Sequence, residues 1–139
     1  MFELDYRLKN DTDIIGEWPL SVLLLHRDSN FPWCILVPKR ANMSEIYELS
    51  EGDQQSLLEE SRMLAHALMG VFRPDKLNVA ALGNVVKQLH IHHIARFVGD
   101  SAWPGPVWGA VAMKEYKGNA FADRIEVLRK ALSGTGLHW

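Results

Sequence analysis

One short segment of the chain concentrates the side chains that could do chemistry. Residues 88–94 have the sequence QLHIHHI and contain three of the six histidines. Side chains alternate between the two faces of an extended strand, so Gln88, His90 and His92 would project together, while His93 would point the other way. Polar side chains that alternate with large aliphatic ones are typical of a strand with one core face and one face that lines a site.

The pair of His90 and His92 is compatible with three interpretations. A neutral imidazole can attack a phosphate through one ring nitrogen while a hydrogen bond fixes the other, and a second, protonated histidine would offset the developing charge. A zinc site would need three or four ligands, and no obvious third ligand accompanies the pair in the sequence. The third interpretation is a half-exposed strand whose outer face carries histidines without a function.

The elements that must position these histidines form an antiparallel pattern. Residues 21–25 and 34–37 are short apolar runs separated by turn-forming residues, which predicts a hairpin of two buried strands. Residues 77–82 and 89–97 predict two further strands joined by a tight turn at Gly83-Asn84. Strand pairs with a helix between them predict an α+β domain with an antiparallel sheet.

Two amphipathic helices accompany the strands. Ser50 can cap a long helix, with Asp53 as a partner three residues on, and Pro74 would end it. The apolar residues expected on its buried face are Leu57, Leu58, Leu64, Ala65, Leu68, Met69 and Phe72. A final helix near the C-terminus is marked by Phe121, Ile125, Leu128 and Leu132.

Length and composition restrict the class of protein. The 139 residues fit one domain, which we expect to span residues 1–139, and 47% hydrophobic with 23% charged residues is typical of a globular chain. A net charge of -2 argues against a polycation that coats nucleic acid or an anionic membrane. The single cysteine, Cys34, excludes an internal disulfide framework and is expected in the core. Without a signal peptide or a spanning apolar run, a cytoplasmic location is expected.

Residues 76–96 resemble the signature region of the histidine triad (HIT) family. The family motif alternates three histidines with apolar residues and is preceded by a glycine and an amide residue, here Gly83 and Asn84. Residues 35–39 (ILVPK) and 103–109 (WPGPVWG) extend the resemblance. The chain looks like a bacterial branch described as HIT-family hydrolases or diadenosine-tetraphosphate-hydrolase-like proteins, in which glutamine commonly replaces the first histidine.

The resemblance implies a role for each residue of the triad. His90 matches the middle histidine, which is the nucleophile that takes the nucleotidyl group in a phosphohistidine intermediate. His92 matches the last histidine, which contacts the scissile phosphate. Gln88 stands in place of the first histidine, so it belongs to the catalytic set but cannot donate a titratable proton.

The resemblance also implies substrate contacts, a fold and partners. Asp28 matches a residue that holds ribose hydroxyls, Asn84 matches an amide near the phosphates, and Asn78 more loosely matches another polar contact there. The implied fold is HIT-like, with about five antiparallel strands, a long helix and a C-terminal helix. The implied partner is a small-molecule nucleotide, bound by a homodimer, with neither nucleic acid nor membrane. No cofactor is required, and a divalent cation is an open option with a polyphosphate substrate.

The leading hypothesis is a nucleotide hydrolase or nucleotidyl transferase that acts on a dinucleoside polyphosphate or a nucleoside phosphoramidate. The alternative is a nucleotide-binding regulatory protein with little turnover, consistent with Gln88 and with Ala41, where eukaryotic-type members often carry another histidine. A metal-binding module is a third option. For Trp103 and Trp108, packing is favoured over base stacking, and Arg96 either meets a phosphate or pairs with a carboxylate.

Overall fold

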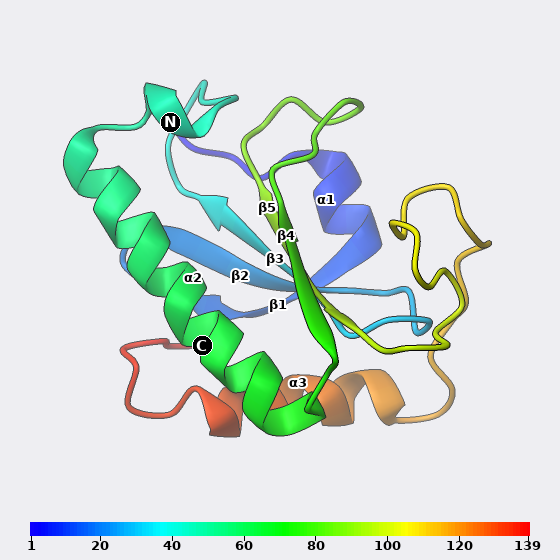
Figure 1. Cartoon of the computed structure of the whole chain (residues 1–139). Helices are drawn as coiled ribbons and strands as arrows, with labels where there is room; N and C mark the ends of the chain where they lie inside the picture. Colours follow the sequence, from blue (N-terminus) through cyan, green and yellow to red (C-terminus); the bar gives the residue numbers. More distant parts are fainter.

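The computed structural model describes residues 1–139 and contains one five-stranded sheet in which every neighbouring pair is antiparallel (Figure 1). In spatial order, the strands are β1 (Thr12–Glu17), β2 (Ser21–His26), β3 (Trp33–Pro38), β5 (Ile91–Arg96) and β4 (Lys76–Ala80). The helices are α1 (Tyr6–Asp11), α2 (Glu51–Phe72) and α3 (Ala120–Ala131), with a short 3-10 helix at Ile46–Glu48. The predicted α+β class is therefore confirmed.

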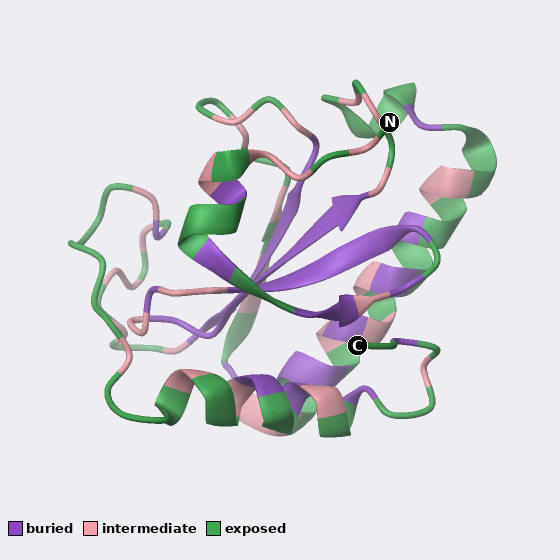
Figure 2. Cartoon of the chain, turned by 180° about the vertical axis from the view of Figure 1, so that it is seen from behind, coloured by how far each residue is buried: buried purple, intermediate pink, exposed green.

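Both faces of the sheet are covered, which explains the unbroken apolar runs of β2 and β3. Along β2, Leu23 and Leu25 belong to the larger core under α2 and α3, whereas Val22 and Leu24 belong to a second core that includes Leu8 of α1. A strand covered on both faces shows a continuous apolar run and not an alternation. In Figure 2 the central strands are accordingly coloured as buried along almost their full length.

The two predicted strand pairs are present, but only one is a simple hairpin. β2 and β3 pair with Leu25 opposite Cys34, as the apolar runs predicted. β4 and β5 also pair, but the segment between them, residues 81–90, is a loop and not a tight turn at Gly83-Asn84. We refer to residues 81–90 as the active-site loop. One of its attachments is a backbone hydrogen bond of 2.8 Å from Leu89 N to the carbonyl of Met43, a contact that local sequence does not reveal.

The sequence analysis missed β1 and α1. β1 is an edge strand with polar residues and an irregular register between Ile14 and Gly16, so its apolar alternation is weak. Gly16 is required there because a Cβ atom would lie 2.7 Å from the carbonyl oxygen of His138. The C-terminal segment therefore closes against β1, where Glu17 and His138 form a β-bridge.

Helix α2 has the predicted ends but only part of the predicted buried face. Ser50 accepts a hydrogen bond from Asp53 N at 3.1 Å, and the helix ends at Phe72. Leu58 and Met69 were expected in the core, but their side chains are 71% and 44% exposed. Each is one residue, or about 100°, beyond a position of the buried stripe. That stripe consists of Leu57, Glu60, Leu64, Ala67 and Leu68.

Helix α3 follows its predicted pattern. Ile125, Leu128 and Leu132 are buried, and Phe121 packs against the same core. Cys34 lies fully buried on β3, where burial raises the pKa of its thiol to about 12, so the prediction of a core cysteine is confirmed. None of the helices is long and apolar enough to cross a membrane.

The buried stripe of α2 contains one carboxyl group, Glu60. Its Oε2 accepts from the backbone N–H of Leu20 at 3.0 Å, while its Oε1 and the Oγ of Ser21 are buried without a hydrogen-bond partner. Burial raises the pKa of Glu60 above its usual value of 4.5. A carboxyl whose folded-state pKa is raised stabilises the fold below the unfolded-state pKa and loses that contribution as the pH rises through the folded-state pKa.

Glu60→Gln is therefore expected to increase the free energy of unfolding at pH ~8 by about 1 kcal/mol, because a neutral amide avoids burial of a charge and can donate to Ser21. The difference should vanish near pH ~4, where the wild-type carboxyl is protonated. Urea unfolding at both pH values measures it, with the exposed neighbour Glu59→Gln as the control. A Gln variant less stable than wild type at pH ~8 would contradict this account.

Candidate active site

The loop places His90 directly before β5, with one ring nitrogen fixed by the backbone. Its Nδ1 lies 2.6 Å from the carbonyl oxygen of Gln88. A carbonyl oxygen only accepts hydrogen bonds, so Nδ1 carries the proton and donates, and Nε2 keeps its lone pair. The ring is almost fully buried. In the neutral ring, Nε2 is thus the nitrogen whose lone pair is available for attack on a phosphate.

A glycine allows the loop to fold back over this ring. A Cβ atom on Gly83 would lie 2.5 Å from the carbonyl oxygen of Val86 and 3.1 Å from Cε1 of His90. Only a residue without a side chain fits this approach of backbone to imidazole. The glycine that precedes the histidine motif is therefore explained by close packing against the His90 ring.

The second histidine, His92, uses both of its ring nitrogens within the protein. The indole N–H of Trp33 donates to His92 Nδ1 at 3.0 Å, and His92 Nε2 lies 2.9 Å from the carbonyl oxygen of Leu82. Nε2 therefore carries the proton, and Nδ1 has no room for another because a donor already faces it. Burial is the largest cause that lowers the pKa of His92, to about 4.

His92 is accordingly neutral near pH ~7, and the structure does not support a protonated second histidine that offsets phosphate charge. Its ring instead packs edge-on against His90, with 4.8 Å between the centroids. By binding the carbonyl of Leu82, His92 also anchors the start of the active-site loop to β5. No group of three or more His, Cys, Asp or Glu side chains in the structure could hold a metal ion.

Trp33→Phe is expected to raise the pKa of His92 by about one unit, because it removes the donor that opposes protonation of Nδ1. NMR titration of the imidazole resonances measures this shift. Trp108→Phe is the matched control, since Trp108 packs edge-on against His92 at 5.0 Å between centroids without a hydrogen bond to it. Equal shifts in the two variants would show that burial alone sets the pKa of His92.

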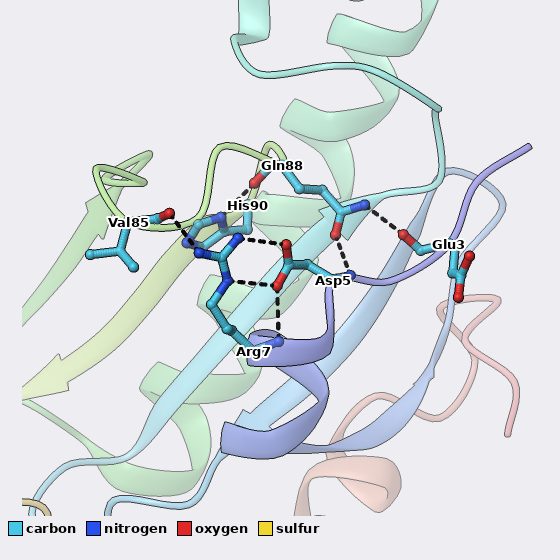
Figure 3. A network of polar contacts seen from close by, with 6 residues as sticks. All are labelled: Glu3, Asp5, Arg7, Val85, Gln88 and His90. Carbon is cyan, nitrogen blue, oxygen red and sulfur yellow. Dashed lines mark hydrogen bonds and ion pairs between the residues drawn. The ribbon is translucent and has the colours of Figure 1, made fainter.

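Gln88 departs most from the sequence-based expectation. It lies before β5, so it does not project from the strand face that carries His92, and its side chain points to the N-terminal segment (Figure 3). Its Oε1 accepts from Asp5 N at 2.9 Å and its Nε2 donates to the carbonyl of Glu3 at 2.8 Å. Both polar atoms of this side chain are therefore engaged within the protein, while Gln88 still lines a pocket together with His90, and its place in the catalytic set stays a prediction.

His93 faces away from the site, as the alternation predicted. Its Nε2 lies 2.7 Å from Ser61 Oγ on α2, and its Nδ1 lies 3.1 Å from the carbonyl oxygen of Ile91. Burial lowers the pKa of His93 to about 4. This histidine therefore joins the sheet to α2 as a neutral core residue.

Two pockets meet at His90. The first has a volume of about 380 Å³, and its apolar and aromatic walls come from Leu8, Trp33, Ile35, Val85, Val86 and Trp108. The second has a volume of about 410 Å³ and a largely polar lining that includes Ser44, Glu45, Lys87 and Gln88. Gly83, Asn84 and His90 line both pockets. A phosphorus atom at His90 Nε2 would therefore have an apolar compartment on one side and a polar compartment on the other.

The structure brings one of the three expected substrate contacts to this junction. Asn84 lines both pockets, whereas Asp28 and Asn78 line neither. The Asp28 carboxylate accepts from the backbone N–H groups of Asn30 and Lys114, at 3.0 and 3.2 Å, and so closes the loop after β2. The side-chain oxygen of Asn78 accepts from Arg96 at 2.8 Å.

Arg96 pairs with a carboxylate and not with the site, and the pair is buried. Its guanidinium donates to both Asp100 oxygens, at 2.8 and 3.0 Å. Trp103 lies under this guanidinium, with 5.7 Å from the ring centroid to Arg96 Cζ. Trp108 packs edge-on against Trp33 and His92, so packing describes both tryptophans, although Trp108 also lines the apolar pocket.

Two further polar residues, His26 and Asp11, line the apolar pocket. His26, at the end of β2, stacks on Trp33 with 4.1 Å between ring centroids, and its Nδ1 accepts from Asp28 N at 3.0 Å. Burial lowers the pKa of His26, which leaves it neutral with a proton on Nε2. Asp11, the last residue of α1, lines the same pocket. Asp11 was missed because the sequence analysis did not predict α1, the helix that places it at the pocket.

Comparison with known proteins places this geometry in a family. The family model described as "HIT domain" matches residues 7–99, which include the loop and both site histidines. A histidine triad protein of known structure from Marinobacter aquaeolei VT8 is 48% identical in sequence to this chain, with a TM-score of 0.91. The match covers 95% of this chain and 96% of that chain. A histidine triad protein from Bradyrhizobium japonicum is 44% identical, with a TM-score of 0.92 over 94% of this chain and 98% of that chain. One from Sinorhizobium meliloti 1021 is 39% identical, with a TM-score of 0.91 over 94% of this chain and 97% of that chain.

Among curated proteins, no sequence matches the chain. The matched residues contain His90, directly before β5, and His92, on β5. Three solved histidine triad proteins are each at least 39% identical to the chain. The chain belongs to the histidine triad (HIT) family.

Proposed function

We propose that this protein is a nucleotide hydrolase or nucleotidyl transferase that works through a covalent intermediate on Nε2 of His90. The observation that carries the proposal is the 2.6 Å hydrogen bond from His90 Nδ1 to the Gln88 carbonyl, at the junction of two pockets. In the neutral ring, this bond places the proton on Nδ1, leaves the lone pair on Nε2 and fixes the ring through the backbone. Membership of the HIT family supports nucleotide binding and this class of chemistry.

The apolar pocket is the compartment for the nucleoside. The stacked pair of His26 and Trp33 contributes flat aromatic surface, and Trp108 adds another wall. Bases bind well to aromatic surfaces because every base has an apolar face. The Asp11 carboxylate supplies an acceptor for ribose hydroxyls on the same side. Asp11 is therefore proposed as the ribose contact in place of Asp28, which does not line this pocket.

The polar pocket is the compartment for the leaving group. Lys87 is exposed there and carries a positive charge, and Ser44 and Asn84 add hydrogen-bonding groups. Gln88 has no proton to give to a leaving group. A polyphosphate leaves as a stable anion, whereas the amine of a phosphoramidate must first be protonated. The pocket therefore favours a dinucleoside polyphosphate over a nucleoside phosphoramidate.

The reaction proceeds in two steps, formation and breakdown of a covalent intermediate. The Nε2 lone pair of His90 forms a P–N bond while the P–O bond to the leaving phosphate breaks, and the leaving group takes the electron pair. Water, or another acceptor in a transferase, then attacks the phosphorus and releases the nucleotidyl group, the P–N electron pair returns to Nε2, and the proton lost by the acceptor passes to the solvent. The Gln88 carbonyl faces the Nδ1–H throughout and stabilises the positive charge of the phosphorylated imidazole.

Rapid mixing with diadenosine tetraphosphate, followed by quenching and intact-protein mass spectrometry, tests this proposal. We expect an adenylyl mass increment on the wild-type protein and release of adenosine monophosphate. Adenosine phosphoramidate, tested separately, should give the adduct more slowly. His66→Ala is the control because His66 lies exposed on α2. No adduct and no product, together with calorimetric binding of adenosine monophosphate, would instead indicate a regulatory protein with little turnover.

A further inference from the structure

The N-terminal segment lies against the active-site loop (Figure 3). Residues 3–7, which we call the N-terminal strap, lead into the first turn of α1. The side-chain amide of Gln88 binds the strap through both of its polar atoms, with Oε1 accepting from Asp5 N at 2.9 Å and Nε2 donating to the Glu3 carbonyl at 2.8 Å. Asp5 and Glu3 lie 83 and 85 residues before Gln88 in the sequence.

The strap holds the loop at a second point. The Asp5 carboxylate binds the Arg7 guanidinium through two hydrogen bonds, of 3.1 and 3.0 Å. Arg7 in turn donates to the carbonyl oxygen of Val85 at 3.1 Å. Since Asp5 also caps α1 by accepting from Arg7 N at 2.9 Å, the strap, the helix and the ion pair form one connected hydrogen-bonded unit. The loop is therefore fixed at Val85 and at Gln88.

This fixation reaches the nucleophile through a single peptide group. The carbonyl of Gln88 accepts from His90 Nδ1, and the N–H of the same peptide group, on Leu89, donates to the Met43 carbonyl at 2.8 Å. The orientation of this peptide determines where the lone pair of His90 Nε2 points. The N–H of this peptide group is held by the Met43 carbonyl, and the residue that carries its carbonyl, Gln88, is held by the strap through its side chain.

We infer that Gln88 is a positioning residue, which couples the N-terminal strap to the peptide carbonyl that orients His90. The inference rests on the proposed function and deepens it. It also explains why an amide stands where the family motif has a histidine. An amide presents a donor and an acceptor side by side on one carbon, matching Asp5 N–H and the Glu3 carbonyl, whereas the two nitrogens of an imidazole point in divergent directions.

Single-turnover kinetics with diadenosine tetraphosphate test the coupling. Gln88→Ala is expected to slow adduct formation by about 10- to 100-fold, because small displacements of a nucleophile are costly. Affinity for adenosine monophosphate should change less than about twofold, since Gln88 does not line the apolar pocket. Arg7→Ala should slow the same step although Arg7 lines neither pocket. The double variant should be no slower than Gln88→Ala, because both residues act through one unit.

Arg62→Ala, which removes an exposed ion pair with Glu59 on α2, is the matched control and should react like wild type. A loss of rate in Gln88→Ala without any loss in Arg7→Ala would overturn the inference, because Gln88 would then act on the substrate directly. An unchanged rate in Gln88→Ala would overturn it as well. Thermal unfolding followed by circular dichroism identifies any variant that fails to fold, and Gln88→Glu, which retains only the acceptor, then replaces Gln88→Ala.

Nitrogen-15 NMR of the His90 ring provides a readout that needs no substrate. In the wild-type protein we expect the proton on Nδ1, and in Gln88→Ala a measurable population with the proton on Nε2. If wild type forms no adduct but this tautomer shift occurs, the proposed function fails while the positioning role stands. A tautomer that is the same in Gln88→Ala, Arg7→Ala and wild type would contradict the positioning role, whatever the activity.

Discussion

Replacement of His90 by alanine is expected to lower the rate of product formation by at least about 10³-fold, which corresponds to ~4 kcal/mol of transition-state stabilisation. The reason is that Nε2 of His90, a residue that lines both pockets, has no hydrogen-bond partner within the protein, whereas both nitrogens of His92 are engaged by Trp33 and Leu82. His92 is therefore not expected to take over the covalent step. Steady-state turnover of diadenosine tetraphosphate, with product quantified by chromatography, measures the loss.

A cavity variant separates loss of the nucleophile from loss of structure. In His90→Gly, added imidazole should occupy the vacant space and restore part of the turnover, and no adenylyl adduct should remain on the protein. Binding of adenosine monophosphate should persist in both variants, because the aromatic wall of the apolar pocket is unchanged. If His90→Ala retained more than about a tenth of the wild-type rate, the nucleophile would have to be another group.

The second large effect concerns stability. Asp100→Ala is expected to reduce the free energy of unfolding by about 3–5 kcal/mol, because it leaves a buried guanidinium without its counter-charge. Arg96 is 1% exposed, and its other polar partner is the Asn78 oxygen. Asp100 additionally accepts from the backbone N–H groups of Phe97 and Ala102, each at 3.1 Å, so the loop after β5 loses its anchor as well.

The same pair predicts a pH dependence. Hydrogen bonds from Arg96 lower the pKa of Asp100 to about 2, below its ordinary value of 3.8. A lowered folded-state pKa contributes stability that is present above the unfolded-state pKa and is lost as the pH falls through the folded-state pKa. The difference in stability between wild type and Asp100→Ala should therefore be constant above pH ~5 and shrink between about pH 4 and 2.

Urea unfolding curves across this range measure both effects. Glu59→Ala is the matched control, because Glu59 and Arg62 form an exposed pair with side chains 55% and 57% exposed. Its expected cost is below about 0.5 kcal/mol. An Asp100→Ala variant that lost no more stability than Glu59→Ala would show that the Arg96 pair does not stabilise the fold.

The parts of the molecule that follow from local pattern were predictable. The α2 cap at Ser50 depends on residues three apart, and the hairpin of β2 and β3 depends on two apolar runs with a short polar link. The family itself could be predicted because its motif surrounds His90 within a few residues. Weak patterns failed for the same reason, since β1 is a polar, irregular edge strand and α1 has only six residues.

What only the tertiary structure decided is the direction in which each side chain of the site points. Gln88 binds Glu3 across 85 residues, and His92 binds Trp33 across 59, so neither partner can be found from spacing along the chain. Types and spacing in the sequence determined which groups could attack a phosphate. Hydrogen bonds between segments that folding brings together determined that His90 Nδ1 faces the Gln88 carbonyl, that both ring nitrogens of His92 are engaged, and that the Gln88 side chain binds the N-terminal strap.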